Sequence, residues 1–301
     1  MIHDQLTIVS VVGHNNGSVA IPSIMKSMKE LPGSKGLLLS IEKPENLPPE
    51  IEWKHIYFLN YKQYTVFMMH SLYAFIKTDF CLVVQDDGWV LNGDKFTEEF
   101  YEYDYIGPPT HCGFQFSSDA SNIEHLFLQF HWLDKPNTLV VQNGGFSLRS
   151  KRFLEACNVL GITHTSPEPI MLKNDSMKKA KPWIHNWNED VQLTGLLRPA
   201  LTSCGYKFAP LNIATRFGME YLDPIWHKDI DFNNIVGHHA KSRILLPNNT
   251  IKVPNNVGRV GKMEQDLISW MKNKKGYNIV MDKDWESKFG GGDGSNKSVV
   301  R

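Results

Sequence analysis

Short apolar runs alternate with amphipathic stretches over the first part of the chain, up to residue 90. The pattern predicts, in chain order, a strand at residues 6–12, a helix at 19–31, strands at 36–41 and 55–59, a helix at 64–76 and a strand at 80–84. The last run is uninterrupted, which is typical of a strand buried on both faces. This order predicts an α/β fold, with a mostly parallel, Rossmann-like central sheet flanked by helices.

The periodicity is weaker after residue 90. Residues 111–137 are irregular and rich in histidine and aromatic residues, so we interpret them as a long loop and a candidate lid. The remaining predicted elements are a strand at 139–142, a helix from Ser150 to about Leu160, a helix that Asn188 begins and that ends near Pro199, short strands at 206–210, 214–221 and 235–239, and a helix at 263–271.

These patterns suggest one main domain. We interpret residues 1–245 as this domain, with halves at 1–110 and 111–245. Residues 246–288 would form a C-terminal extension that contains a helix. The glycine- and serine-rich residues 289–301 are expected to be a disordered tail.

Composition narrows the class of protein. Lysine plus arginine equals aspartate plus glutamate, at 32 each among 301 residues, which offers no electrostatic footprint for nucleic acid. No apolar run approaches the length of a membrane span, and the first residues lack the basic start and cleavage site of a signal peptide. The four cysteines are scattered without metal-site spacing. We therefore expect a cytoplasmic protein with reduced thiols.

The strand at 80–84 ends in Gln85-Asp86-Asp87-Gly88. Ligands of open α/β sheets bind outside the carboxyl ends of the strands. Two adjacent carboxylates there need a positive partner, and a divalent cation with phosphate is a common one. The alternative is an ordinary Asp-Asp-Gly turn without function.

Three later clusters could also carry chemistry. The glycine pair in Asn143-Gly144-Gly145 would let the backbone approach a ligand, or would simply form a tight turn. In Asn188-Glu189-Asp190, one carboxylate could act as a general base, although the helix dipole alone favours acidic residues in a first turn. His238 and His239 could bind a metal or a phosphate, or have only a structural role.

In this order, the motifs resemble those of inverting glycosyltransferases of the GT-A fold. The sequence is most similar to an uncharacterised glycosyltransferase-like family of bacterial and eukaryotic proteins. The motifs that carry the resemblance are Gln85-Asp86-Asp87, Asp104-Tyr105-Ile106-Gly107-Pro108-Pro109, Asn143-Gly144-Gly145-Phe146-Ser147-Leu148-Arg149 and Asn188-Glu189-Asp190. A more distant likeness to β1,3-glycosyltransferases rests on Glu189-Asp190-Val191 and Gly195. The resemblance extends over residues 6–239.

The resemblance implies a role for each matching residue. Asp190 would be the catalytic base, and Glu189 would bind a donor or acceptor hydroxyl. Asp87, with Asp86, would hold Mn²⁺ or Mg²⁺ on a nucleotide-sugar diphosphate, although Gln85 stands where the usual Asp-x-Asp motif begins. The other implied ligands are His238 or His239 for the metal or phosphate, and His14, Asn15, Glu42, Gln85, Asn143, Gly144, Gly145, Arg149, Trp187 and Asn188 for the donor and acceptor.

The resulting hypothesis is an inverting glycosyltransferase that moves a sugar from a nucleotide sugar to a hydroxyl of a saccharide or lipid-linked acceptor, as in polysaccharide biosynthesis. The alternatives are a nucleotide-sugar-binding protein without transfer activity and a metal-dependent nucleotide-sugar pyrophosphatase, which also uses clustered carboxylates. The lysines after residue 271 could bring the helix at 263–271 to an anionic membrane surface, or could simply favour the end of a packed helix.

Overall fold

The main sheet has six strands in the order β3-β2-β1-β4-β10-β6. They are β1 (Leu6–Val12), β2 (Lys35–Ser40), β3 (Ile51–His55), β4 (Phe80–Val83), β6 (Tyr105–Ile106) and β10 (Ser147–Ser150). The first four are parallel, whereas β10 runs antiparallel to β4 and β6. The computed structural model describes residues 2–118, 123–127, 137–163, 171–172, 181–182, 187–220, 222, 227, 229–240, 242–254 and 262–282. The predicted α/β fold with a mostly parallel sheet is confirmed.

Helices cover both faces of this sheet. They are α1 (Ile21–Glu30) and α6 (Leu211–Phe217) on one face, and α2 (Tyr61–His70) and α3 (Lys151–Val159) on the other. Successive residues of a strand point to opposite faces. In β1, Leu6 and Ile8 therefore join the core under α1, whereas Val9 and Val11 join the core under α2. This arrangement explains why the strand is apolar throughout.

The predicted third strand was displaced. The strand β3 ends at His55, whereas residues 56–60 follow the carboxyl edge of the sheet. The amide of Ile56 donates to the Ser40 carbonyl at 3.0 Å, and that of Leu59 donates to the Gly13 carbonyl at 2.7 Å. The apolar run at 55–59 was misleading because its aromatic side chains are exposed instead of buried.

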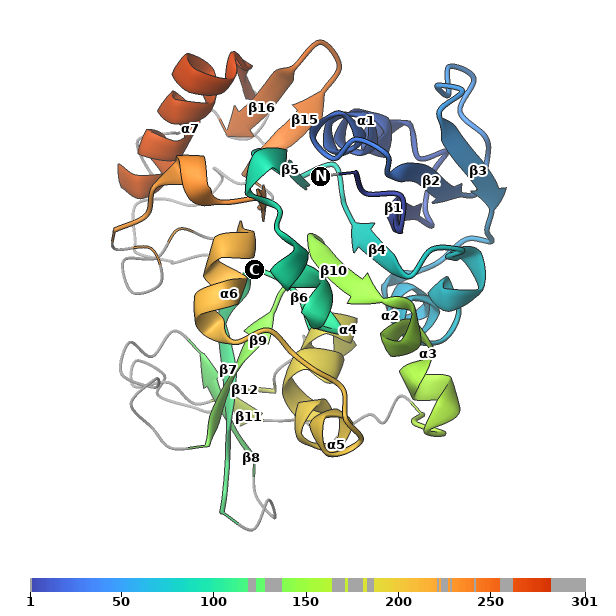
Figure 1. The fold of residues 1–301 in the computed structure, drawn as a ribbon, viewed down its shortest axis with the longest axis vertical. Coiled ribbons are helices and arrows are strands. Elements are labelled where there is room, and N and C mark those ends of the chain that lie inside the picture. Colours follow the sequence, from blue (N-terminus) through green and yellow to red (C-terminus); the bar gives the residue numbers. More distant parts are fainter. Residues whose placement is uncertain are drawn as a thin grey trace.

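The predicted loop at residues 111–137 was wrong for the described residues, whereas a lid role for this stretch stays a prediction. Within 111–118 and 123–127, the chain forms β7 (Pro109–Phe116) and β8 (Ile123–Phe127), which join β9 (Thr138–Gln142) in an antiparallel sheet. Cys112 and Phe114 are two residues apart in β7, so their side chains point to the same face of this sheet, where they join a small core. Residues 119–122 and 128–136 lie outside the described part of the chain, as does the predicted tail at 289–301. Figure 1 shows this sheet below the main sheet.

The helix that follows Asn188 is longer and less regular than predicted. It consists of α4 (Glu189–Val191), a π-helical turn over Gln192–Leu196 and α5 (Arg198–Ser203). Pro199 does not end it, because a proline in the first turn of α5 needs no amide hydrogen. The predicted strand at 214–221 was also wrong. Its first part belongs to α6, whose Ile213 and Phe217 face the core, and among the described residues up to 220 the strand is limited to Gly218–Met219, as β13.

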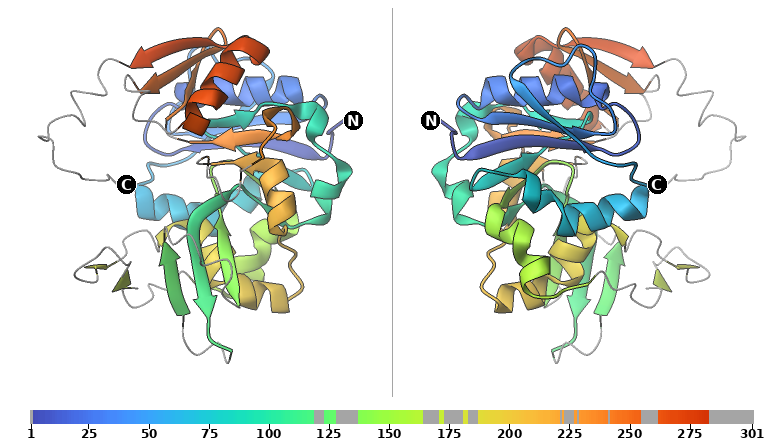
Figure 2. Two further views of the ribbon diagram at one scale, coloured as in Figure 1. Left: turned by 90° about the vertical axis from the view of Figure 1, so that its left-hand side faces the viewer. Right: turned by 90° about the vertical axis from the view of Figure 1, so that its right-hand side faces the viewer.

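The C-terminal residues form β15 (Ile244–Leu246), β16 (Thr250–Pro254), α7 (Lys262–Lys275) and β17 (Asn278–Asp282). Figures 1 and 2 show these elements beside α1, at the end of the molecule opposite β8. Their core includes Trp89 of β5 (Gly88–Val90), together with Leu267 and Met271 of α7. The predicted helix at 263–271 is confirmed, and it ends before Gly276, whose φ is 68°.

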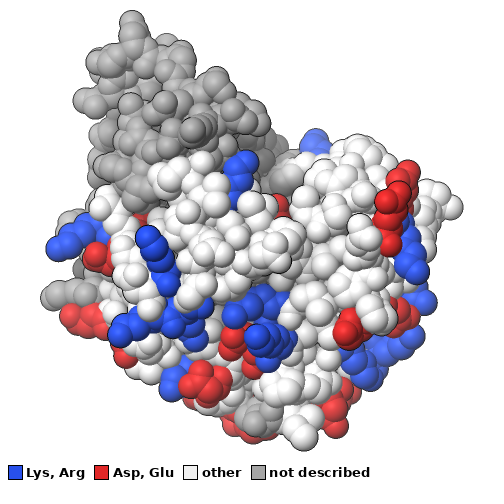
Figure 3. All heavy atoms as spheres, turned by 90° about the horizontal axis from the view of Figure 1, so that it is seen from above, with Lys and Arg blue, Asp and Glu red and all other residues white. Residues whose placement is uncertain are grey.

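Acidic and basic side chains lie close together on the surface. The face in Figure 3 shows both kinds interspersed. Ion pairs of the structure include Lys26–Glu30 at 3.1 Å and Lys54–Glu52 at 2.9 Å. Within the described parts of the chain, every helix is too short or too polar to span a bilayer.

The motif residue Asp104 has a structural role. Its carboxylate accepts hydrogen bonds from the Ser150 hydroxyl at 2.6 Å, from Arg152 at 2.7 and 2.6 Å, and from the Lys207 amide at 2.8 Å. The Asp104 bonds therefore join β6 to the start of α3 and to the segment before α6. Burial alone would raise the pKa of Asp104, but the bonds from Arg152 and Ser150 lower it below the ordinary value.

Replacing Asp104 with asparagine is expected to lower the free energy of unfolding by about 2–3 kcal/mol, because an amide cannot accept all four bonds. A lowered pKa stabilises the fold above the unfolded value of about 4, and this contribution is lost as the pH falls through the folded pKa. Urea unfolding at pH 7 and at pH 3.5 measures both effects. Asp94→Asn is the matched control, since this aspartate is 71% exposed and pairs only with Lys95 among the described residues. An equal loss in both variants would contradict the structural role.

Candidate functional site

Three loops meet where β4 ends. The Gln85-Asp86-Asp87 turn leaves β4, and the Asn143–Phe146 turn enters the neighbouring β10, whose Ser147 pairs with Val83. The loop after β1, which contains His14 and Asn15, lies at the same edge because β1 and β4 are parallel. The strand order 3-2-1-4 reverses direction between β1 and β4, and such reversal points form the ligand crevice of open α/β sheets.

The Asn143 turn contacts the start of α4. The amide of Gly144 donates to Asp190 Oδ2 at 3.1 Å, and the amide of Val191 donates to Asp190 Oδ1 at 2.7 Å. A β-carbon at Gly144 would lie 2.3 Å from Glu189 Oε1, so any larger residue here would displace the Glu189 carboxylate. The predicted Asn143 and Asn188 motifs, which are far apart in sequence, are therefore in direct contact.

Arg149 binds one member of this acidic pair, Glu189, from the interior of the protein. Its side chain is fully buried, and Nη2 donates to Glu189 Oε1 at 3.0 Å and to the Gly144 carbonyl at 3.2 Å. Its Nε donates to the Ser147 hydroxyl at 2.9 Å. The resemblance implies a donor or acceptor ligand at this position. The structure instead gives Arg149 a positioning role, because the guanidinium is enclosed by the protein and holds Glu189 and the glycine turn.

Asp190 has the electrostatic environment of a base that works near neutral pH. It is 9% exposed. Burial, together with the nearby charges of Glu189 and Glu220, raises the pKa of Asp190 to about 7. The two backbone amides oppose this shift only in part. A carboxylate in this state accepts a proton more readily than an ordinary aspartate does.

A second group of polar side chains surrounds His239. Its Nε2 lies 3.2 Å from Asp87 Oδ1 and 3.1 Å from Gln85 Oε1. Burial lowers the pKa of His239, but the carboxylates of Asp87, Glu220 and Asp190 together raise it more, so the net shift is upward. A β-carbon at Gly145 would lie 2.3 Å from His239 Nε2, which explains the second glycine of the turn. The turn thus contacts both groups of side chains.

His238 does not belong to this group. It precedes His239 in β14 (Gly237–His239), so its side chain points to the opposite side of the strand. There it packs against Trp89, with ring centroids 4.0 Å apart, and its Nδ1 accepts a hydrogen bond from Arg243 at 3.2 Å. Of the two predicted histidines, His239 therefore lies with the Asp87 group and His238 does not, and a metal or phosphate role for His239 stays a prediction.

The two groups of side chains, Glu189–Asp190 and Asp87–His239, form the centre of the site, and the other predicted residues lie around them or at the same edge of the sheet. Asp86 is near His14, whose charge acts on it, and burial and Asp87 raise the pKa of Asp86. The Asn15 side chain accepts from the Gly17 amide at 2.7 Å and so shapes the loop after β1. Glu42 follows β2 at the same edge and is exposed, and its side chain makes no hydrogen bond to the described residues of the site. Glu42 is therefore the predicted residue with the least structural support.

Asn188 and Trp187 lie on the outer side of the acidic pair. Asn188 precedes α4 but does not cap it with its side chain, since its Oδ1 accepts from the Tyr61 hydroxyl instead. Trp187 lies under Lys62, whose Nζ is 4.4 Å from the ring centroid. Both residues thus contact the first turn of α2.

Sequence reasoning missed three residues of the site. Glu220 accepts from Asn143 Nδ2 at 3.1 Å, and its carboxylate lies 4.0 Å from His239 Nδ1. Tyr64 accepts from Gln85 Nε2 at 3.1 Å, and Tyr61 binds Asn188. The tyrosines lie in the first turn of α2, which was predicted only as an amphipathic helix. Glu220 follows β13, which the sequence pattern merged with part of α6 into one predicted strand at 214–221. No sequence pattern therefore indicated that Glu220 lies at the site.

These contacts connect the two acidic groups. Asp87 contacts His239, His239 lies near Glu220, and Glu220 binds Asn143, whose neighbour Gly144 binds Asp190. Among the described residues, no group of three or more histidine, cysteine, aspartate or glutamate side chains is arranged to hold a metal ion. Asp87 and His239, whose Oδ1 and Nε2 atoms lie 3.2 Å apart, are nevertheless ligand types that suit a divalent metal ion.

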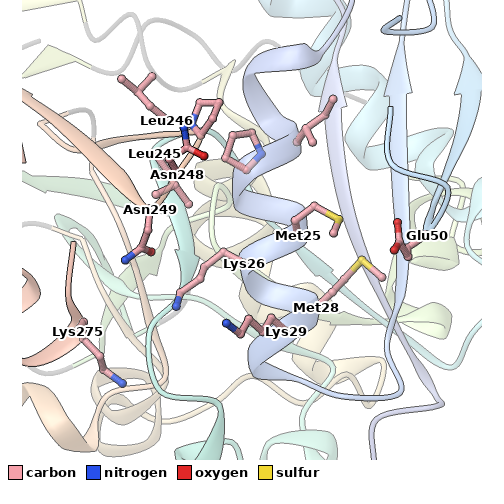
Figure 4. Close-up of a pocket in the computed structure, with 13 residues that line it drawn as sticks. Met25, Lys26, Met28, Lys29, Glu50, Leu245, Leu246, Asn248, Asn249 and Lys275 are labelled. Atoms are coloured by element: carbon pink, nitrogen blue, oxygen red, sulfur yellow. The ribbon is translucent and has the colours of Figure 1, made fainter. Parts of the chain in front are cut away.

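A separate groove of about 860 Å³ lies over α1 (Figure 4). Met25 and Met28 line it on α1, Leu245 lines it beside β16, and Lys29 and Lys275 lie at one end. Its lining is mostly apolar and contains none of the predicted site residues. We therefore assign no chemistry to it.

The sheet and this centre define the class of protein: an α/β protein with a cluster of acidic and polar side chains where the strand order reverses. Residues 50–239 match a family described as "Protein of unknown function (DUF5672)". This match covers more than half of the chain, so the chain belongs to that family. No curated protein is matched by the sequence.

Two solved structures show a remote likeness. One is the galactosyltransferase LgtC in complex with donor and acceptor sugar analogues, with 12% identity and a TM-score of 0.45 over 94% of this chain and 99% of that chain. The other is the apo form of the glycosyltransferase GlyE of Streptococcus pneumoniae TIGR4, with 12% identity and a TM-score of 0.41. The match covers 94% of this chain and 63% of the GlyE chain. We base no residue role on these two likenesses.

Proposed function

We propose that this protein is an inverting glycosyltransferase that uses a nucleotide sugar as the donor and a saccharide or lipid-linked hydroxyl as the acceptor. One observation carries the proposal: the Asn143-Gly144-Gly145 turn contacts both Asp190 and the Gln85–Asp87 group at the reversal point of the sheet. A phosphate-rich donor fits the crevice between β1 and β4. An acceptor hydroxyl that approached from the α4 side would meet Asp190.

The reaction assigns distinct tasks to the residues. Asp190, in its ionised form, removes the proton of the acceptor hydroxyl as that oxygen attacks the anomeric carbon. The bond from this carbon to the diphosphate breaks on the opposite face, so the configuration inverts and a nucleoside diphosphate leaves. Arg149 holds Glu189 beside the base, which leaves Glu189 positioned to bind a sugar hydroxyl. Glu220 and the buried surroundings keep the Asp190 proton affinity high.

Incubation with a panel of nucleotide sugars tests the activity. The expected products are a transferred sugar, or free sugar from slow hydrolysis, together with a nucleoside diphosphate. Sugar phosphate with a nucleoside monophosphate would instead identify a pyrophosphatase. Binding of a nucleotide sugar without any product would identify a binding protein.

Metal dependence is a separate prediction. Asp87, with His239, would hold Mn²⁺ or Mg²⁺, and such an ion would neutralise charge on the leaving diphosphate. We expect that EDTA abolishes activity and that excess Mn²⁺ restores it. Asp87→Asn should lose this restoration, while Asp266→Asn, an exposed residue of α7, should retain it. Activity that is indifferent to EDTA would contradict the metal role.

A cytoplasmic location and contact with a membrane remain predictions. In α7, Leu267, Ile268 and Met271 are used in the C-terminal core, which leaves the lysines at its end as the membrane-facing candidates. Sedimentation with vesicles that contain anionic lipid tests this contact.

A further inference from the structure

The segment from Ile56 to Tyr61 carries exposed side chains, although its backbone is held in place by the protein. Leu59 packs against the core under α2, and a β-carbon at Gly13 would lie 2.5 Å from Leu59 Cβ. Asn60 begins α2 with a capping box, in which it exchanges bonds of 3.0 and 2.9 Å with Gln63. The backbone of this segment is therefore fixed at both ends along the carboxyl edge of the sheet.

Three aromatic side chains of this segment point away from the core. Tyr57 is 82% exposed, Phe58 is 60% exposed and Tyr61 is 59% exposed. In the described part of the chain, these are all the aromatic members among the exposed large hydrophobic residues. A held segment with several exposed aromatic rings is typical of a binding surface, because free exposure of such rings brings no stability.

Tyr61 connects this surface to the candidate site. Its hydroxyl donates a hydrogen bond to the Asn188 side chain, directly before Glu189 and Asp190. The hydroxyl is close enough that burial, Asp190 and Glu189 raise the pKa of Tyr61, although more than half of the side chain is exposed. The Tyr61 hydroxyl therefore reaches the site, while more than half of the side chain remains exposed to solvent.

We propose that Tyr57, Phe58 and Tyr61 form an aromatic platform that binds the apolar face of an acceptor sugar. This inference rests on the proposed function. The C–H bonds on one face of a pyranose ring are attracted to the negative face of an aromatic ring. A sugar whose hydroxyl reaches Asp190 would extend past Asn188 onto Tyr61, and further sugars would reach Phe58 and Tyr57. The acceptor predicted here is therefore an oligosaccharide or the saccharide part of a glycolipid.

The position of Tyr61 favours the acceptor over the donor, although the neighbouring Leu59 binds Gly13 in the loop after β1. The donor nucleotide belongs to the crevice beside His14 and Asn15, whereas Tyr61 is bonded to the residue that precedes the catalytic base. A stacked nucleobase of the donor is the main rival ligand. A lipid surface and a second copy of this chain are the others.

The test uses the full chain and five proteins: wild type, Tyr61→Ala, Phe58→Ala, Tyr61→Phe and the control Val159→Ala, whose side chain is 72% exposed on α3. Each is applied to a printed array of defined oligosaccharides, and its affinity for uridine, guanosine, adenosine and cytidine diphosphates is measured by calorimetry. Tyr61→Ala and Phe58→Ala should weaken oligosaccharide binding by about tenfold each, the loss of one aromatic contact. Tyr61→Phe should retain most of the binding, and Val159→Ala all of it. Nucleotide affinity should stay unchanged in every variant, and slow donor hydrolysis should stay unchanged in the control Val159→Ala.

Several results would overturn the platform while leaving the proposed function intact. They are donor turnover with no oligosaccharide bound by wild type, a loss of nucleotide affinity in the alanine variants, and a loss of vesicle binding or of dimerisation instead of oligosaccharide binding. If the wild type neither binds nor turns over any nucleotide sugar, the proposed function itself fails. The two failures are thus distinguishable by the donor assays.

Discussion

Asp190→Asn is expected to lower the rate of sugar transfer by about 10²–10⁴-fold, the usual contribution of a general base. An amide cannot take the proton of the acceptor hydroxyl, although it fills nearly the same space. Donor binding should change little, since the donor contacts are assigned to the β1 and β4 loops. Single-turnover assays with the active nucleotide sugar, together with calorimetry of donor binding, measure the two effects separately.

The pH profile of the wild type offers an independent test of the same assignment. Because burial and the neighbouring carboxylates raise the pKa of Asp190 to about 7, the ionised base is present above this pH and is lost below it. Transfer should therefore increase between pH 6 and 8. The control Asp266→Asn should leave both the rate and the profile unchanged. Wild-type activity in Asp190→Asn would remove the proposed base.

Arg149→Met is expected to destabilise the fold by about 3–5 kcal/mol, because it leaves the buried Glu189 charge without its cation. The pair is separated by 3.0 Å, and the two side chains are 0% and 9% exposed. The double variant Arg149→Met with Glu189→Gln should recover part of the loss, since no charge then remains uncompensated. Urea unfolding followed by circular dichroism measures the free energy of unfolding in each case.

The matched control for this prediction is Arg216→Met. The Arg216–Glu99 pair has a similar separation of 2.7 Å, but its side chains are 49% and 41% exposed. Solvent screens such a pair, so its loss should change the free energy of unfolding by at most about 1 kcal/mol. Equal destabilisation by Arg149→Met and Arg216→Met would contradict the special role of the buried guanidinium.

Local patterns predicted the first half of the fold well. The strand over residues 6–12 was confirmed at both ends, and the run at 80–84 was confirmed as a central strand, because both are buried on two faces. The third strand was displaced since sequence alone does not separate a buried apolar run from an exposed aromatic one. The β7–β8 hairpin was missed because histidine and polar residues dilute its alternation.

The candidate site was predictable as a set of motifs but not as a set of contacts. The glycine pair and the acidic pair were predicted to serve one site, and they do touch. Arg149 appeared to be a ligand because nothing in the motif reveals that β10 runs inside the sheet, where an arginine must be enclosed. Glu220 and Tyr61 come from elements whose ends were uncertain, so their convergence depends on tertiary structure alone.

The strand β10 also limits whether residues can be inserted or deleted between Gly145 and Arg149. Ser147 and Arg149 point to the face that carries α2 and α3, and Leu148 points to the face that carries α1. Inserting or deleting one residue after Gly145 would exchange these faces, bringing a leucine to Glu189 and a guanidinium into the hydrophobic layer. Relatives that keep this chemistry are thus expected to differ in length elsewhere, with the count from the second glycine to the arginine held constant.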